Sequence, residues 1–382
     1  IGDQAVTEGQ LVTFFASATD ADVPAQTLTF SLQGTVPSGA SIDPQTGQFA
    51  WITSAGQAGG YSLTIRVTDN GAPALFSEQT VNVTVLSNAA SFQGLGDLPG
   101  GIFSSRPFGV SGNGAVVVGE SEGASGPESF RWTVGGGIEN FSTVVGVPVT
   151  ARAASLDGSV IVGDSSVGVF RWSQTGGIQT IVGNTSAYSG NAVSSDGLVV
   201  VGKGQVNIFT PQGAFRWTAA TGAVRLDSLA GYADGEAFGI SAGGNVIVGA
   251  NYPFFGSQEA QAVRWVADGL GGFTVEGLGD LPGGNVFSRA LAVSSDGSVI
   301  VGVSESDLGM EVFRWTVTGG MQGLGIKADA VSVSADGSTV LAGYDIWDEN
   351  NGARNIESVM SQLGVPNLVG WSGLMGQVMT GD

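Results

Sequence analysis

Three aspartates near the start of the chain, Asp20, Asp22 and Asp69, have the residue type and spacing of a cation site. They lie in two turn-rich loops that a Greek-key β-sandwich would bring to the same end, where Asp3 adds a fourth carboxylate. Carboxylates are the hard oxygen ligands that calcium takes, with backbone carbonyls and water completing its shell. The sequence therefore predicts a calcium site at this end of the sandwich and no other cofactor.

A simpler interpretation stays open for the same residues. Aspartate is common in the turns of β-rich proteins because its carboxylate accepts hydrogen bonds from nearby backbone N–H groups. Asp20 and Asp69 would then cap their own turns, and the three side chains would form only an incomplete ligand set.

A second series of aspartates recurs farther along the chain, each directly before a glycine: Asp157, Asp196, Asp296 and Asp336. A regular series of carboxylates can suggest catalysis or metal binding. However, Asp-Gly between two strands predicts a two-residue type I′ hairpin turn, because both central residues of that turn need a positive φ. We therefore assign this series a structural role.

Arginine and tryptophan recur as adjacent pairs, which can suggest sugar platforms or cation–π recognition. The pairs are Arg131-Trp132, Arg171-Trp172, Arg216-Trp217, Arg264-Trp265 and Arg314-Trp315. A binding site is normally unique, whereas this pair returns in repeat after repeat. We expect each tryptophan to pack between repeats, with the arginine stem beside it and the guanidinium bonded to a neighbouring turn.

The composition excludes several classes of function. The 382 residues include no Cys and no His, which removes zinc fingers, iron–sulfur clusters, disulfides and Ser-His-Asp or Cys-His catalysis. The formal net charge of −20 is the opposite of the basic surface that nucleic acids and anionic membranes attract. No apolar run reaches the ~18 residues of a spanning helix, so we expect no membrane insertion.

The first 86 residues have a strand pattern of their own. Short alternating strands are predicted at 10–18, 28–32, 48–52, 61–68 and 77–85, with turn clusters between them. About 90 residues with this spacing of turns predict an immunoglobulin-like β-sandwich over residues 1–86. Residues 87–91 form a small polar linker.

Residues 92–382 are a repeat. A strand ending in Val-Ser, a turn and a Val-rich strand ending in glycine recur six times, at intervals of 39 to 53 residues with a mean near 45. The repeats also carry the Arg-Trp strand and a Gly-Leu-Gly strand, which we place first in its unit. Four antiparallel strands every ~45 residues are typical of a β-propeller blade. The predicted fold class is therefore all-β, a β-sandwich followed by a β-propeller.

The remainder of the chain starts a seventh repeat. Residues 371–381 align with 333–343, placing Ser372 on Ser334 and Gly381 on Gly343. We favour seven blades, the last one short of its Arg-Trp strand, with six blades and an appendage as the alternative. The open edge of an incomplete blade could be completed by a strand of another molecule, which would give a filament. A longer native chain or a three-stranded blade are the other two explanations.

Two glycine-rich segments, 94–101 (Gly-Leu-Gly-Asp-Leu-Pro-Gly-Gly) and its near copy 277–284, add a specific signature to the repeat. Together with the recurring markers, they resemble the HAF-repeat family of extracellular bacterial proteins. The resemblance covers roughly residues 92–382. It implies export and a propeller-like fold, and it brings no known catalytic residues.

Several motifs of the first segment recur in a second family: Asp20-Ala21-Asp22, Ile42-Asp43-Pro44, Val67-Thr68-Asp69 and the closing Val81, Val83, Val85 strand. Residues 1–86 thereby resemble cadherin-like and immunoglobulin-like modules of bacterial surface proteins, which implies a spacer or adhesion unit. In cadherins, these aspartate positions form one half of a calcium site between domains, and a preceding domain supplies the other half. The 86–89 segment has no carboxylate, so we expect no calcium bridge toward the propeller.

These observations predict a non-enzymatic, exported bacterial surface or extracellular-matrix protein, although this chain itself shows no signal peptide. The sandwich would act as a spacer, and the propeller would serve adhesion or assembly by binding a protein, a surface glycan or further copies of itself. The alternative is a carbohydrate-active propeller enzyme, a glycosidase or lyase with two paired carboxylates. Its acids would come from the unrepeated Glu236, Glu259, Glu305 and Glu311.

Overall fold

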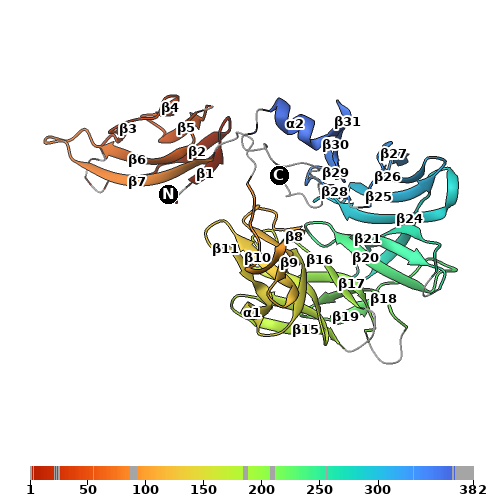
Figure 1. Ribbon diagram of the computed structural model, residues 1–382. Coiled ribbons are helices and arrows are strands. Elements are labelled where there is room, and N and C mark those ends of the chain that lie inside the picture. Colours follow the sequence, from red (N-terminus) through yellow and green to blue (C-terminus); the bar gives the residue numbers. More distant parts are fainter. Residues whose placement is uncertain are drawn as a thin grey trace. The chain divides into compact units, whose positions relative to one another are not determined.

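The chain divides into two structural units, residues 1–91 and 92–382, in the computed structural model. The structure describes residues 2, 4–20, 22, 24, 26–54, 56–86, 93–183, 188–206, 211–254, 257–329, 331–363 and 365. Both units are built from β-strands, and the helices of the described residues are two short segments (Figure 1).

Residues 1–91 form a sandwich of two sheets, with strand orders β1-β7-β6-β3 and β2-β5-β4. The strands are β1 (Gln4–Thr7), β2 (Leu11–Phe15), β3 (Thr29–Gln33), β4 (Ala40–Ile42), β5 (Gln48–Ile52), β6 (Gly59–Thr68) and β7 (Phe76–Leu86). The five predicted strands are present, and the structure adds the short strands β1 and β4. Strand β1 runs parallel to β7, whereas β6 and β7 form a long antiparallel pair.

The sandwich core follows from alternation along the strands. Phe49 and Trp51 on β5 are both fully buried, and they pack with Leu63 of β6 and Val83 of β7 from the opposite sheet. The Phe49 ring also stacks on Phe14, with ring centroids 4.6 Å apart. Because successive side chains of a strand face opposite sides, one face of each sheet is apolar and the other is exposed.

Residues 92–382 contain six four-stranded antiparallel sheets among the described residues. In chain order they are β8 (Gly100–Val110), β9 (Val116–Gly123), β10 (Gly126–Thr133) and β11 (Gly137–Asn140); β12 (Val149–Ala154), β13 (Val160–Ser165), β14 (Gly168–Ser173) and β15 (Gly177–Gly183); β16 (Ser189–Val193), β17 (Val199–Gly204), β18 (Gly213–Thr218) and β19 (Gly222–Arg225); β20 (Asp234–Ile240), β21 (Val246–Tyr252), β22 (Gln261–Ala267) and β23 (Phe273–Gly279); β24 (Gly283–Val293), β25 (Val299–Ser306), β26 (Gly309–Thr316) and β27 (Gly320–Gly323); β28 (Val331–Val333), β29 (Thr339–Ala342), β30 (Asp345–Asp348) and β31 (Gly352–Asn355).

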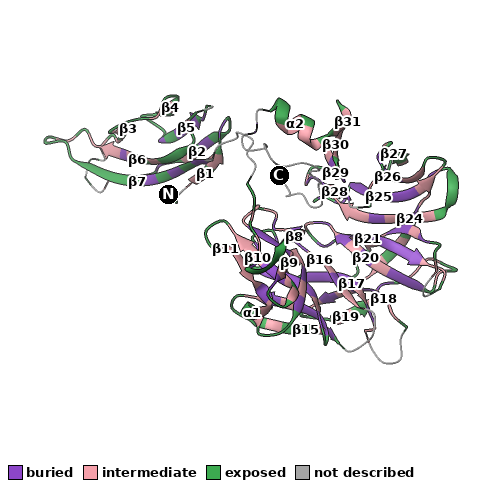
Figure 2. Ribbon diagram, viewed as in Figure 1, coloured by how far each residue is buried: buried purple, intermediate pink, exposed green. Residues whose placement is uncertain are grey.

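These sheets are the blades of a β-propeller. The first strand of each blade from β12 to β28 packs against strands of the preceding blade, so the first strands form the inner layer (Figure 1). The Val-rich strands β9, β13, β17, β21 and β25 are buried almost throughout (Figure 2). The all-β prediction of a sandwich followed by a propeller is confirmed.

The predicted order of strands within a unit is wrong by one position. The Gly-Leu-Gly segment 277–279 ends β23, which pairs with the Arg-Trp strand β22 before it and closes that blade as its outermost strand. The physical reason is the short connection from the Arg-Trp strand, which favours an antiparallel hairpin with the segment that follows. Each blade therefore begins at the strand that ends in Val-Ser.

The Asp-Gly hairpins also differ from the predicted two-residue turn. In the second blade the Gly158 N–H donates to the Ser155 carbonyl, and the Ser155 N–H donates to the Val160 carbonyl. The β-turn therefore spans Ser155–Gly158, and Asp157 is its third residue. In the predicted type I′ turn, the aspartate would have been the first of the two central residues. Gly158 has a φ of +71°, which explains why glycine follows the aspartate.

The tryptophans of the Arg-Trp strands pack between blades, as predicted. Trp172, Trp217, Trp265 and Trp315 are each at most 9% exposed. Trp217 of the third blade packs with Val160 and Val162 of the second, and Trp265 packs in the same way against Val199 and Val201 of the third. Neighbouring blades thereby share one apolar layer.

Two short helices complete the described propeller unit. Helix α1 (Phe141–Val145) follows β11, is capped by the Asn140 side chain and buries Phe141. Helix α2 (Ile356–Gln362) directly follows β31. Neither described helix has the length and apolar character needed to cross a membrane. The seventh repeat depends on residues 371–381, which lie outside the described residues.

Candidate functional site

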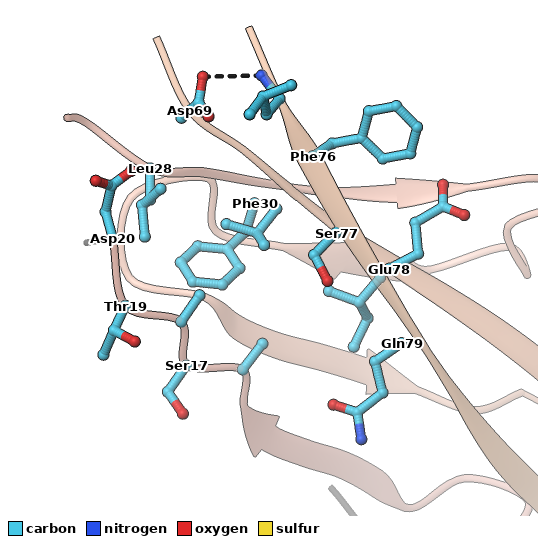
Figure 3. Close-up of a pocket in the computed structure, with 15 residues that line it drawn as sticks. Ser17, Thr19, Asp20, Leu28, Phe30, Asp69, Phe76, Ser77, Glu78 and Gln79 are labelled. Atoms are coloured by element: carbon cyan, nitrogen blue, oxygen red, sulfur yellow. Dashed lines mark hydrogen bonds between the residues drawn. The ribbon is translucent and has the colours of Figure 1, made fainter. Parts of the chain in front are cut away.

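Asp20 and Asp69, two of the predicted calcium ligands, line the same pocket at one end of the sandwich (Figure 3). The pocket has a volume of about 310 Å³, and its inner wall includes Phe30 and Ile65. The prediction that the two loops meet at one end is therefore confirmed. Asp22 is not part of the pocket lining, and Asp3 lies outside the described residues.

Each of these aspartates is bonded within its own loop. Asp20 Oδ1 accepts the Asp22 N–H at 2.7 Å, and Asp22 Oδ2 accepts the Gln26 side-chain amide at 2.8 Å. Asp69 Oδ1 accepts the N–H groups of Gly71 and Leu75, the second shown as a dashed line in Figure 3. These bonds are the turn caps of the simpler interpretation.

The three carboxylates do not gather into one ligand set in this arrangement. No group of three or more acidic side chains in the described ranges lies close enough to hold a metal ion. The turn caps explain this for Asp20 and Asp69, because they hold each carboxylate against its own backbone, while the Asp22 carboxylate is bonded to the Gln26 side chain. Calcium binding stays a prediction that requires these caps to rearrange.

The repeated aspartates are structural groups of the hairpins. The Asp157 carboxylate accepts the Ser155 hydroxyl at 2.8 Å and the Ser159 N–H at 2.9 Å, and Asp196, Asp296 and Asp336 repeat these contacts. Donors around the carboxylate favour its ionised form. They lower the pKa of all four, and the Ser334 hydroxyl and Ser338 N–H lower the pKa of Asp336 to about 2.

A set of polar residues on the first and second strands joins four consecutive blades, and we call it the inner-strand network. Its members are Arg152, Asp164, Ser189, Asn191, Lys203, Asp234, Glu236, Tyr252 and Arg289. Between the second and third blades, Asp164 forms an ion pair with Arg152 and accepts the Gly190 N–H at 2.8 Å. One carboxylate is thus bonded to residues of two blades.

The third and fourth blades are joined by two carboxylates of β20. Lys203 Nζ lies 2.6 Å from Asp234 Oδ2, and both side chains are largely buried. Glu236 Oε1 accepts hydrogen bonds from the Ser189 hydroxyl at 2.9 Å and the Asn191 amide at 3.0 Å. The two acids are therefore held by donors from the preceding blade.

Tyr252 extends the network to the fifth blade. Its ring lies 5.4 Å from Lys203 Nζ, and the charge of Arg289 in the fifth blade acts on its phenol. Burial, reinforced by the nearby Glu236 charge, raises the pKa of Tyr252 to about 12. The phenol therefore stays protonated at neutral pH.

The inner strands also line an open hollow of about 170 Å³. Its lining comes from four blades: Phe108 to Val110 of the first, Arg152 to Ala154 of the second, Asn191 of the third and Ser332 of the sixth. Two members of the network, Arg152 and Asn191, thus face a space at the inner layer of the propeller. This is where a ligand would meet the network.

Only one of the four acids considered for an enzyme, Glu236, belongs to this network. Glu311 is bonded to the Ser306 hydroxyl and the Gly325 N–H within the fifth blade, and Glu305 accepts a bond from Asn285. The structure adds a second acid on the same strand, Asp234, which sequence reasoning missed. A signal was available in the sequence, because Asp234 and Glu236 lie at the start of one inner strand, at positions where the other repeats have no acid.

Comparison with protein families identifies the first unit. Residues 1–86 match the He_PIG family, described as "Putative Ig domain". The N-terminal unit is therefore immunoglobulin-like. No curated protein matches the chain.

Solved structures with a similar fold include TolB from Acinetobacter baumannii, at 14% identity and a TM-score of 0.47 over 78% of this chain and 76% of that one. The β-propeller domain of the Trilobed protease from Pyrococcus furiosus matches at 11% identity and a TM-score of 0.45, over 78% of this chain and 89% of that one. Mouse cadherin-23 EC22-24 matches 22% of this chain and 29% of its own, at 22% identity and a TM-score of 0.19.

Proposed function

We propose that the chain is an exported, non-enzymatic binding protein, in which the propeller carries the binding surface and the immunoglobulin-like unit is a spacer. The partner is a protein or a glycan at a bacterial surface or in the extracellular matrix. The three recurring markers and the glycine-rich segments 94–101 and 277–284 support assigning the repeat to the HAF family and support export. Immunoglobulin-like modules and propellers both commonly present interaction surfaces on a rigid scaffold.

The observation that carries this proposal is the pairing of the acids in the inner-strand network. Glycoside hydrolysis by two carboxylates needs one that holds a proton and one that stays ionised. Asp234 is instead ion-paired with Lys203, and Glu236 accepts two hydrogen bonds from the third blade. Both carboxylates are engaged in contacts between blades, which favours a binding role.

A carbohydrate-active enzyme is the second candidate, and one observation favours it. Asp234 and Glu236 are two residues apart on β20, a spacing that places both side chains on the same face of the strand. Tyr252 provides a protonated phenol close to Glu236. These three groups are the ones that a catalytic mechanism would use.

One experiment separates the two functions. The full chain is mixed with neutral and acidic polysaccharides, and both its retardation in polysaccharide-containing gels and the release of reducing ends are measured. Our proposal predicts retardation by at least one polymer without any release of reducing ends. Release of reducing ends that Glu236→Gln abolishes would establish the enzyme and contradict the proposal.

A further inference from the structure

The arginine of the Arg-Trp strand has a partner in four of the five blades that carry it. Ion pairs join Arg131 to Glu139 at 2.7 Å, Arg264 to Glu276 at 2.7 Å and Arg314 to Glu349 at 3.2 Å, and Arg171 Nε donates to the Gly197 carbonyl at 3.1 Å. Arg216 is the exception. It forms no hydrogen bond or ion pair with any described residue, and its Nε is buried without an acceptor.

The cause is a substitution on the neighbouring strand. Glu139 and Glu276 lie directly opposite their arginines across the ladder, whereas Val224 of β19 lies opposite Arg216. The third blade therefore keeps the cation and lacks its carboxylate. Burial lowers the pKa of Arg216, although a guanidinium remains charged in a protein. A partly desolvated cation without a partner is costly, so this position favours an anion from outside.

Arg216 lines a pocket of about 370 Å³ at the outer strands of the third and fourth blades. Arg225 also belongs to the lining, but it pairs with Phe215 across the ladder, so its side chain points to the other face of the blade. There Arg225 Nη2 donates to the Ala233 carbonyl at 2.9 Å, and the side chain packs on Gly213, where an added Cβ would come within 2.5 Å of Nε. Arg216 is therefore the guanidinium that faces the pocket.

The rest of the pocket is not cationic. Asp227 and Asp268 contribute exposed carboxylates, and Asp268 uses Oδ1 for the N–H groups of Leu270 and Gly272. Phe273 adds an aromatic wall, with its ring centroid 5.4 Å from the Arg216 guanidinium carbon. The pocket therefore combines one cation, two carboxylate acceptors and one apolar surface.

We propose that this pocket binds a uronic acid residue of an acidic polysaccharide. The sugar carboxylate pairs with the guanidinium group of Arg216, and sugar hydroxyls donate hydrogen bonds to Asp227 and Asp268. The Phe273 ring packs against the apolar C–H face of the sugar. The inference rests on the proposed binding function and gives it a ligand class at a second site, away from the inner strands.

The charged groups of the pocket discriminate against simpler ligands. A neutral sugar supplies hydroxyls but leaves Arg216 without its anion. Inorganic phosphate supplies charge, but at neutral pH it has few hydroxyl donors, and its charge of between one and two is repelled by the Asp227 and Asp268 carboxylates more strongly than the single charge of a uronate. A uronate supplies both kinds of group in one ring, so the pocket should bind glucuronate more tightly than glucose or phosphate.

The test is an NMR titration of the full chain with glucuronate, glucose and inorganic phosphate as separate probes. We expect glucuronate to bind at least about tenfold more tightly than glucose, as the loss of a charged hydrogen bond requires. Added salt should weaken glucuronate binding. Equal affinity for glucose and glucuronate, or for phosphate and glucuronate, overturns the assignment.

Two variants locate the site. Arg216→Met removes the unpartnered cation, and Val224→Glu supplies the carboxylate that the first and fourth blades already have, so each should weaken glucuronate binding about tenfold or more. The matched control is Arg131→Met, at the same strand position in the first blade, which should bind glucuronate as the unmodified chain does. Unchanged binding in Val224→Glu, or an equal loss in Arg131→Met, overturns the site.

The proposed function and this site can fail separately. If glucuronate does not bind but the chain is still retarded by another polymer, the uronate site is overturned and the binding function stands. If the chain releases reducing ends from a uronate polymer, the non-enzymatic function is overturned, while the loss of binding in Arg216→Met still reports on the site.

Discussion

Lys203 and Asp234 form a buried ion pair that joins two neighbouring blades. Lys203 Nζ of β17 lies 2.6 Å from Asp234 Oδ2 of β20, and the two side chains are only 14% and 6% exposed. Asp234 Oδ1 also accepts the Gly235 N–H, so both carboxylate oxygens have donors. A charge buried to this degree is tolerated only when it is paired and hydrogen-bonded.

Breaking this pair from one side should destabilise the propeller. Asp234→Leu leaves the Lys203 ammonium buried without its partner, and we expect a loss of about 3–5 kcal/mol in the free energy of unfolding, measured by urea denaturation. The double variant Lys203→Met/Asp234→Leu removes both charges and should recover most of that loss. Additive losses in the double variant would show that the two side chains are not coupled.

Trp217 tests the packing between blades. The side chain is 6% exposed and lies among valines of the preceding blade, so Trp217→Ala should cost about 3–5 kcal/mol of unfolding free energy. The matched control is Trp132→Ala in the first blade, where the side chain is only half-buried and the loss should be smaller. A larger loss at Trp132 than at Trp217 would contradict the packing argument.

The hairpin aspartates predict a specific response to acid. The pKa of Asp336 falls from 3.8 to about 2 in the folded chain, so its ionised form stabilises the fold above about pH 4, and this stability is lost as the pH falls toward 2. Asp157, Asp196 and Asp296 shift in the same direction, so acid titrations of the unfolding free energy should show a decline over this window.

Asparagine provides the control for this response, because Asn113 already occupies the same turn position in the first blade and accepts the Ser111 hydroxyl at 2.8 Å. Asp336→Asn should therefore keep the turn and reduce the decline between about pH 4 and pH 2. An unchanged acid response in a chain with all four aspartates replaced by asparagine would rule out these groups as its source.

Calcium binding at Asp20, Asp22 and Asp69 is measurable as a thermal shift. For a site with a Kd of about 1 mM, calcium at about 10 mM would stabilise the immunoglobulin-like unit by about 1.4 kcal/mol. A unit of this size would gain about 4–8 °C in Tm per kcal/mol in calorimetry of the full chain. The Asp20→Asn/Asp69→Asn variant should lose the shift. No calcium-dependent shift in the unmodified chain means that these aspartates act only as turn caps.

The sequence by itself determined the two-unit all-β architecture and the packing role of the tryptophans. The reason is repetition: a residue that returns at one strand position, such as Trp217 or Trp265, meets the same neighbours each time, so one local argument applies to several blades. It also indicated that the Asp-Gly aspartates serve the turns, because turn chemistry is local. The order of strands within a blade was misassigned, since sequence alone does not show which neighbouring strand a Gly-Leu-Gly segment pairs with.

The candidate sites were decided by the tertiary structure. Asp234 and Glu236 meet Lys203 and Asn191 only because an inner strand of one blade lies against its neighbour, a contact between residues about 30 to 45 positions apart. The unpartnered Arg216 became visible only when the ladder placed Val224, and not a carboxylate, directly opposite it. Such groupings depend on register and on contacts between blades, and the repeat pattern does not record them because they occur where the repeat changes.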